Sequence, residues 1–262
     1  MTSLALTELG TGAEKLVFLH GFTQTGRAWV PIVEKLAEVL PHVRSVLVDL
    51  PGHGDSAEVH ADLRGTAELI ATQCGFASYV GYSLGARVAM QLLIDHPAQV
   101  RRALLISGTA GIEDEGDRLA RTKSDAALAN RLISIGVEAF LKEWLAQPLF
   151  SDLTAEMAMI DDRRRNTARG LAESLQLCGQ GNQEPLWRRL ATSTVPILAV
   201  AGARDVKYVA LARRIAATAP HGRLCVIPDA GHSAALERPD IVAEVIYDWM
   251  TNPSAYSTPT TN

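Results

Sequence analysis

Short apolar runs alternate with amphipathic helical patterns along most of this 262-residue chain, and this alternation constrains its fold more than any other feature. The runs are apolar throughout, which is typical of parallel strands covered by helices on both faces. Strands separated by helices indicate an α/β fold with a mostly parallel sheet flanked by helices. The predicted strands are 16–20, 45–50, 77–81, 102–107, 196–202 and 223–227, and the clearest helices are 31–40, 63–74, 86–96 and 238–250.

The alternation of strands and helices stops after the fourth predicted strand and resumes at the fifth. Residues 111–185 have helical patterns but no strand-like run. We therefore predict a core formed by 1–110 and 186–262, interrupted by a helical cap at 111–185. The cap should fold over the carboxyl ends of the strands, where open α/β sheets bind ligands. It has more acidic than basic side chains, so any preference for anions must come from a few placed arginines.

The composition excludes two classes of protein. The formal net charge of −4 and the pI of about 6.0 provide no basic field of the kind that sequence-independent nucleic-acid binding requires, so we expect no nucleic-acid partner. With 47% hydrophobic and 21% charged residues, the chain has enough apolar surface to offset the loss of chain entropy on folding. A disordered chain is therefore not expected.

The cysteines and the two ends of the chain bear on its compartment. Cys74, Cys178 and Cys225 have no metal-like or disulfide-like spacing, so we predict no metal site and a reducing, cytoplasmic environment. Residues 1–10 lack a secretory pattern, and no apolar run reaches membrane-spanning length, so we expect no leader and no stable membrane insertion. Residues 252–262 are rich in Ser, Thr, Pro and Asn, which predicts a frayed end.

Residues 81–85, Gly-Tyr-Ser-Leu-Gly, match the pattern G-x-S-x-G between a predicted strand and a predicted helix. A strand-to-helix turn this tight favours glycine at both positions, because the chain bends too sharply there for side chains. The turn would lift the Ser83 hydroxyl above the sheet, at the N-terminus of the helix. An ordinary turn that carries a surface serine is the alternative interpretation.

A reactive serine needs an imidazole to accept its proton and a carboxylate to orient that imidazole. His232 is the best candidate among the seven histidines, because it lies between the last predicted strand and the last helix. Asp205, which follows strand 196–202, is the best acid. Asp229 competes with it, but its position three residues before His232 favours capping of the turn. The order Ser83, Asp205, His232 predicts a catalytic triad at one edge of the sheet.

Two backbone N–H groups would complete such a site by binding a developing oxyanion. One belongs to Leu84, which follows the serine. The other should come from the loop after the first predicted strand, most simply from Phe22.

At this point the chain resembles the α/β-hydrolase superfamily over essentially its whole length. The resemblance is carried, in the family's order, by 19–22, 49–54, 81–85, 202–205 and 231–232. It implies an α/β-hydrolase fold with a helical cap insertion.

Within that superfamily the chain is most similar to the 2-succinyl-6-hydroxy-2,4-cyclohexadiene-1-carboxylate synthases of menaquinone biosynthesis. The segments 81–87 and 143–150 carry this narrower resemblance, and Arg118, Arg121, 163–166 and 170–172 also fit it. Arg87 best distinguishes the synthases from the esterase-like relatives, because most of the latter have a small or apolar residue at this position. Ala86 departs from the family, which usually has glycine before this arginine.

The narrower resemblance implies a lyase that eliminates pyruvate from a small substrate with several carboxylates and needs no metal or organic cofactor. Ser83, activated by His232 and Asp205, would act as a general base and would not be acylated. Six further residues would contact the substrate: Arg87, Arg121 and Arg163 at carboxylates, Tyr82 and Trp144 beside the ring, and Gln147 through a hydrogen bond. Arg164 and Arg165 remain alternatives to Arg163, and a core position remains an alternative for Trp144.

Two other functions remain open. The first is a serine hydrolase (an esterase, thioesterase or carbon–carbon bond hydrolase) that acts on a small carboxylate-bearing substrate. The second is a binding protein on an inactive hydrolase scaffold, which the intact Ser83, Asp205 and His232 argue against. In each case we expect a monomer or a small homo-oligomer.

Overall fold

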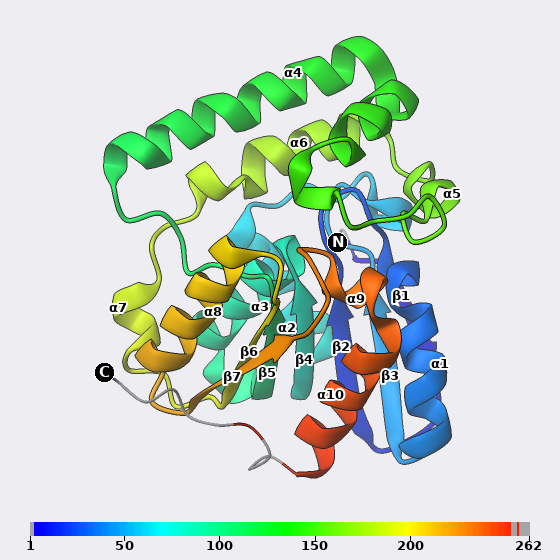
Figure 1. Ribbon diagram of the computed structural model, residues 1–262, viewed down its shortest axis with the longest axis vertical. Coiled ribbons are helices and arrows are strands. Elements are labelled where there is room, and N and C mark those ends of the chain that lie inside the picture. The colour runs from blue at the N-terminus through cyan, green and yellow to red at the C-terminus, as the bar shows by residue number, and fades with distance from the viewer. Residues whose placement is uncertain (1–2, 253–255, 257–262) are drawn as a thin grey trace.

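The computed structural model describes residues 3–252 and 256. Within them, seven strands form one sheet in the order β1-β3-β2-β4-β5-β6-β7 (Figure 1). β1 is antiparallel to β3, and the other neighbours are parallel, as predicted. The strands are β1 Leu6–Leu9, β2 Glu14–Leu19, β3 Val43–Val48, β4 Ala77–Tyr82, β5 Val100–Ile106, β6 Ile197–Gly202 and β7 Gly222–Ile227.

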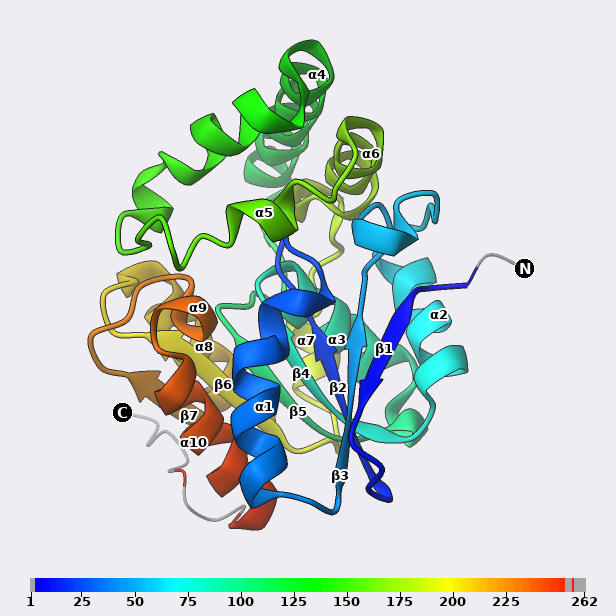
Figure 2. The same cartoon turned by 90° about the vertical axis from the view of Figure 1, so that its right-hand side faces the viewer.

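Helices cover both faces of the sheet. α1 and α10 pack on one face, while α2, α3 and α8 pack on the other (Figure 2). The α-helices are α1 Val30–Val39, α2 Leu63–Cys74, α3 Leu84–Asp95, α4 Glu115–Leu145, α5 Ile160–Arg163, α6 Ala168–Cys178, α7 Trp187–Leu190, α8 Val206–Thr218, α9 Ala234–Glu237 and α10 Pro239–Thr251.

β2 shows why the predicted strands are apolar throughout. Val17 and Leu19 join the buried cluster beneath α2 and α3, whereas Leu16 and Phe18 join the cluster beneath α1 and α10. All four side chains are fully buried. Because successive side chains of a strand point to opposite faces, a strand covered on both faces has no solvent-facing position for polar residues.

The structure contains one strand that the sequence did not predict. β1 lies at the edge of the sheet, where it pairs only with β3, and its Thr7 and Glu8 are exposed. A short, half-exposed edge strand lacks the apolar run by which the others were predicted. The six predicted strands and four clearest helices are all present, with ends shifted by two residues at most.

Between β5 and β6 the described elements are all helical. α4 and α6 lie over the carboxyl ends of the strands, above the sheet in both views (Figure 1 and Figure 2). α4 bends at Gly136, whose φ of 75° and ψ of 170° are not helical. The two halves of α4 pack on α6 through a small apolar cluster that includes Leu132, Phe140 and Leu171.

Two further expectations concern the ends of the chain and membranes. Of the tail predicted to fray, residues 253–255 and 257–262 lie outside the described residues. Among the helices of 3–252, none is both long enough and apolar enough to cross a membrane.

The first testable prediction concerns the core beneath α1. Phe18 is 0% exposed and its ring lies 5.3 Å from that of Trp29, so Phe18→Ala should leave a cavity. We expect a loss of about 3–5 kcal/mol in the free energy of unfolding, measured by urea denaturation. Phe76 is 54% exposed, so the control Phe76→Ala should lose less than about 1 kcal/mol. Equal losses in the two variants would contradict the packing described here.

Candidate active site

Ser83 occupies the tight turn between β4 and α3. Its φ of 52° and ψ of −103° are unusual for a residue with a side chain, and such backbone strain costs on the order of 1–3 kcal/mol. A Cβ on Gly81 would lie 2.4 Å from the Gly85 carbonyl oxygen, and one on Gly85 would lie 2.0 Å from the Leu19 carbonyl oxygen. Neither glycine can therefore be replaced without moving the backbone that presents Ser83.

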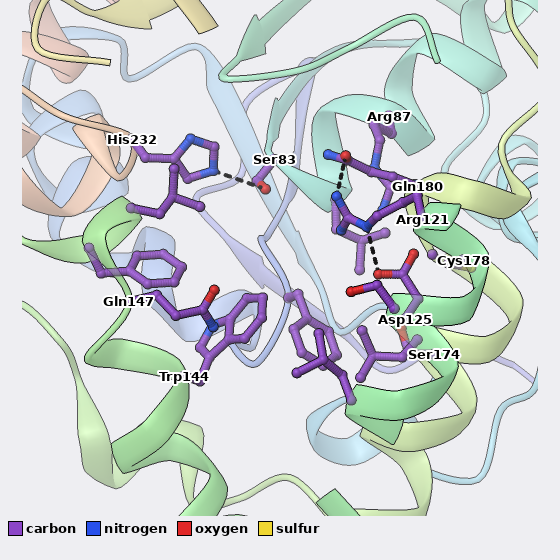
Figure 3. Close-up of a pocket in the computed structure, with 18 of the residues that line it drawn as sticks. Ser83, Arg87, Arg121, Asp125, Trp144, Gln147, Ser174, Cys178, Gln180 and His232 are labelled. Carbon is purple, nitrogen blue, oxygen red and sulfur yellow. Dashed lines mark hydrogen bonds and ion pairs between the residues drawn. The ribbon is translucent and has the colours of Figure 1, made fainter. Parts of the chain in front are cut away.

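The structure brings the three predicted triad residues together. His232 Nδ1 lies 2.8 Å from Asp205 Oδ2. On the other side of the ring, His232 Nε2 lies 3.3 Å from Ser83 Oγ (Figure 3). A carboxylate accepts the Nδ1–H, which leaves the lone pair of Nε2 free to accept the serine proton. Asp205 is itself fixed because its Oδ1 accepts the Tyr208 backbone N–H at the start of α8. Asp229 instead accepts a hydrogen bond from Arg204 at 3.3 Å.

A buried carboxylate also holds the loop that carries His232. Glu237 on α9 is 7% exposed, and it accepts the backbone N–H of Gly231 at 2.5 Å and that of Ser233 at 2.9 Å. The carbonyl of His232 accepts a hydrogen bond from Ser107 Oγ at 2.8 Å. The backbone on both sides of the imidazole is therefore fixed.

The two predicted oxyanion donors are both available. Among the described residues, no hydrogen bond engages the backbone N–H of Phe22 or Leu84. Leu84 is the first residue of α3, so the positive end of the helix dipole adds to its N–H. The Gly21 carbonyl, on the same peptide group as the Phe22 N–H, accepts from His20 Nδ1 at 2.8 Å and from the Gln24 N–H at 3.1 Å.

A cavity of about 300 Å³ lies beside Ser83, and one side of it is basic. In Figure 3, Ser83 lies between His232 and the pair Arg87 and Arg121. Arg87 is 7% exposed, and its Nη1 is buried with no hydrogen-bond partner within the described part of the chain. Burial lowers the pKa of Arg87. Arg121 is held instead by Asp125, at 2.7 Å from its Nε.

The structure separates the three consecutive arginines of the cap. Arg163 is 2% exposed and lines the cavity, and its Nε donates to the Ala158 carbonyl at 2.7 Å. Its Nη1 donates to Thr23 Oγ1 and, at 3.5 Å, to the Phe22 carbonyl. Arg164 and Arg165 instead form ion pairs with exposed carboxylates outside the cavity.

The three other predicted contact residues also line the cavity. The Tyr82 hydroxyl lies 2.8 Å from Ser233 Oγ, which fixes its ring beside His232. Trp144 stacks on Phe140 with ring centroids 5.9 Å apart, so it is part of the cap core and a wall of the cavity at once. Gln147 lies near Trp144 on the side away from Arg121 (Figure 3).

Comparison with known proteins places this geometry in a family. A model described as the alpha/beta hydrolase family matches residues 16–245. The chain belongs to the alpha/beta hydrolase family. The α/β-hydrolase fold predicted from the sequence is thus confirmed, with its mostly parallel sheet and flanking helices.

Among the similar proteins are enzymes of this family with one shared name. The chain is 35% identical over 238 residues to the 2-succinyl-6-hydroxy-2,4-cyclohexadiene-1-carboxylate synthase of Enterobacter sp. (strain 638), covering 87% of this chain and 88% of that protein. The synthase of the same name from Klebsiella pneumoniae is 33% identical, with coverage of 87% and 90%. The resemblance found in the sequence is confirmed, and the chain is an enzyme on the α/β-hydrolase scaffold.

Solved structures agree with this placement. The structure of MenH from S. aureus has a TM-score of 0.85 and 29% identity, and the match covers 95% of this chain and 98% of that one. A thermophilic esterase from Thermogutta terrifontis has a TM-score of 0.80 at 22% identity, over 94% and 92% of the two chains. The esterase supports the fold alone.

The α/β-hydrolase site also contains residues that the sequence did not single out. Tyr208, Asp125 and Gln180 line the cavity, and the Tyr208 ring lies 4.4 Å from that of His232. Spacing gives a weak signal for two of them, since Tyr208 follows Asp205 by three residues and Asp125 follows Arg121 by one helical turn. Asn166, whose side chain reaches the loop of Phe22, lies in segment 163–166 of the narrower resemblance, but no spacing pattern assigns it a role.

Two buried histidines, His20 and His53, support the loop that carries the Phe22 N–H. His20 Nε2 accepts the Leu50 N–H at 3.0 Å, and His53 Nε2 accepts the Thr23 N–H at 3.4 Å. His53 is 0% exposed, and its ring lies 4.9 Å from that of His20. Burial lowers the pKa of His20 to about 4 and that of His53 to about 3, so both rings are neutral acceptors.

The second prediction follows from these two pKa values. Below pH 6.5 these two histidines are protonated in the unfolded chain but stay neutral in the folded protein. The free energy of unfolding should therefore fall as pH decreases from 6.5 toward 4. We expect His53→Gln to reduce this slope by about 1 kcal/mol per pH unit in urea titrations between pH 4.5 and 6. The exposed His221, changed to Gln, is the matched control and should leave the slope unaltered. An unchanged slope in His53→Gln would contradict a neutral, buried His53.

Proposed function

We propose that this enzyme is a carbon–oxygen lyase of menaquinone biosynthesis. It would convert 2-succinyl-5-enolpyruvyl-6-hydroxy-3-cyclohexene-1-carboxylate to 2-succinyl-6-hydroxy-2,4-cyclohexadiene-1-carboxylate and pyruvate. The observation that carries the proposal is Arg87, which lines the same cavity as Ser83 and whose buried Nη1 has no hydrogen-bond partner among residues 3–252 and 256. The names of the relatives support it from the sequence side.

An unpaired charge in a protein interior is destabilising by several kcal/mol. A neutral ester would leave Arg87 unpaired on binding, whereas a carboxylate would pair with it through two parallel hydrogen bonds. Arg121 lies in the same part of the cavity and is held by Asp125 and by Gln180, whose Oε1 is 2.6 Å from Arg121 Nη1. A substrate with carboxylates therefore fits this end of the cavity better than an apolar one.

In the proposed reaction Ser83 acts as a general base. The proton is removed from the ring carbon that carries the succinyl group, where the neighbouring carbonyl makes it acidic, and His232 accepts the serine proton. The C–H electron pair forms a ring double bond, the existing double bond shifts by one position, and the C–O bond to the enolpyruvyl group breaks. The enolpyruvate leaves and tautomerises to pyruvate.

The charge that develops in this step falls on the succinyl carbonyl oxygen. The N–H groups of Phe22 and Leu84, which have no acceptor among the described residues, would donate to it and lower the energy of the transition state more than that of the bound substrate. Asp205 stabilises the imidazolium that forms on His232. The step needs no acyl-enzyme intermediate. The triad and the two N–H donors could also stabilise such an intermediate in a hydrolase.

The third prediction tests the reaction itself. Purified protein should release pyruvate from the enolpyruvyl substrate, measured by a coupled lactate dehydrogenase assay. Ser83→Ala should lower kcat/KM by about 10²–10⁴-fold, because the general base is lost. Absence of pyruvate release together with rapid hydrolysis of p-nitrophenyl esters would overturn the proposal and favour the serine hydrolase.

The fourth prediction separates binding from stability at Arg87. Arg87→Met keeps the volume of the side chain but removes its charge, so KM should rise by about 10-fold or more. The free energy of unfolding should rise by about 1 kcal/mol or more, because an unpaired buried charge is gone. The exposed Arg188 on α7, changed to Met, should alter neither quantity appreciably. Loss of stability in Arg87→Met would mean that Arg87 has a structural partner.

A further inference from the structure

The loop that carries the Phe22 N–H has an unusual backbone at its next residue. Thr23 has a φ of 68° and is 0% exposed. A threonine does not adopt this left-handed conformation by itself, because its branched side chain clashes with the backbone there. The surroundings must therefore hold Thr23 in place. Thr23 accepts hydrogen bonds from Arg163 and Asn166 of the cap and donates one to His53 of the core.

Three consecutive peptide groups of this loop are held by hydrogen bonds. The Gly21 carbonyl is bound by His20 and Gln24. The peptide group between Phe22 and Thr23 is held at both ends, since its carbonyl accepts from Arg163 and its N–H donates to His53. The Thr23 carbonyl accepts from Asn166 Nδ2 at 2.7 Å. The Phe22 N–H is the one polar group of these three peptides that has no partner within the described residues.

The contacts from the cap come from one short segment around α5, which lies beside the loop that follows β2 (Figure 2). Arg163 donates to Thr23 Oγ1 as well as to the Phe22 carbonyl. The Asp162 carboxylate accepts the Thr25 hydroxyl at 2.7 Å. We call Asp162, Arg163 and Asn166 the clasp.

Asn166 is the member of the clasp whose chemistry is most specific. It is 5% exposed, and its Nδ2 donates to the Thr23 carbonyl and, at 2.9 Å, to the Arg163 carbonyl. Its Oδ1 accepts the Gly54 N–H at 2.9 Å. Only a carboxamide supplies two donors and one acceptor in this space, so Asn166 joins three parts of the chain that are distant in sequence.

We propose that Asn166, together with Arg163, is a positioning residue for the oxyanion hole. By fixing the peptide groups that flank the Phe22 N–H, the clasp keeps that donor aimed at the site above Ser83. The cap is then more than a cover for the cavity, because one of its segments holds a part of the catalytic machinery that belongs to the sheet edge. This role does not depend on whether Ser83 acts as a base or as a nucleophile.

The role also changes the interpretation of Arg163. The sequence resemblance implied that Arg163 binds a substrate carboxylate, yet its Nε and Nη1 already donate to oxygens of the protein. Its position at the cavity wall and its contacts with Phe22 and Thr23 fit a residue that acts through the loop.

The fifth prediction tests the clasp through Asn166→Asp, which keeps the shape of the side chain but replaces both donors with an oxygen. Misplacing one oxyanion donor should lower kcat for pyruvate elimination by about 10–100-fold while KM stays within about threefold. The exposed Asn130 on α4, changed to Asp, makes the same chemical change and should leave both constants unaltered.

A second readout does not require the natural substrate. A neutral alkyl fluorophosphonate reacts at Ser83 when Oγ forms a bond to phosphorus, fluoride leaves and His232 takes the proton, and the charged phosphoryl oxygen needs the same two N–H donors. We expect Asn166→Asp and Asn166→Ala to slow this labelling by about 10–100-fold, measured by intact-protein mass spectrometry. A wild-type enzyme that is labelled but releases no pyruvate would contradict the proposed function and not the clasp.

Two outcomes would overturn the clasp. The first is that both Asn166 variants fold, as shown by urea denaturation, and label within about threefold of the wild-type rate. The second is that neither variant folds, in which case Asn166 is a structural residue of the cap.

Discussion

The site depends on the close approach of the N-terminus of α3 to the end of β2. The Gly85 N–H donates to the His20 carbonyl at 3.0 Å, and the space between Gly85 and Leu19 excludes even a methyl group. This contact sets the strained turn that presents Ser83. It also brings the N–H of Leu84 next to the loop that carries the N–H of Phe22, so one backbone contact places the Ser83 hydroxyl and both proposed oxyanion donors.

The parallel sheet supplies the rest of the triad to the same place. Parallel strands end at one edge, so Asp205 after β6 and His232 after β7 reach Ser83 after β4 without any long excursion of the chain. The hydrogen bonds of Glu237 and Tyr208 then fix the loops that carry them. Catalytic geometry of this kind is rigid because backbone groups, and not only side chains, are bonded.

Two buried arginines in the wall of the cavity lower the stability of the fold. Arg87 and Arg163 are both buried, and burial lowers the pKa of each guanidinium. Arg163 recovers part of that cost through hydrogen bonds to the protein, whereas the buried Nη1 of Arg87 has no hydrogen-bond partner in the described part of the chain. The two arginines therefore differ in their hydrogen bonding, although both are buried in the wall of the same cavity.

The sequence by itself determined the fold class, the strands β2 to β7, and the triad of Ser83, Asp205 and His232 as a hypothesis, because these depend on local patterns and on chain order. A tight turn requires glycine, a doubly covered strand requires apolar residues, and parallel strands end together. Only the tertiary structure decided which of Arg163, Arg164 and Arg165 lies inside, since successive side chains at the end of α5 point in different directions and packing selects one of them. It also decided the partners of Asn166 and Glu237, because those hydrogen bonds join side chains to backbone groups whose positions no sequence pattern encodes.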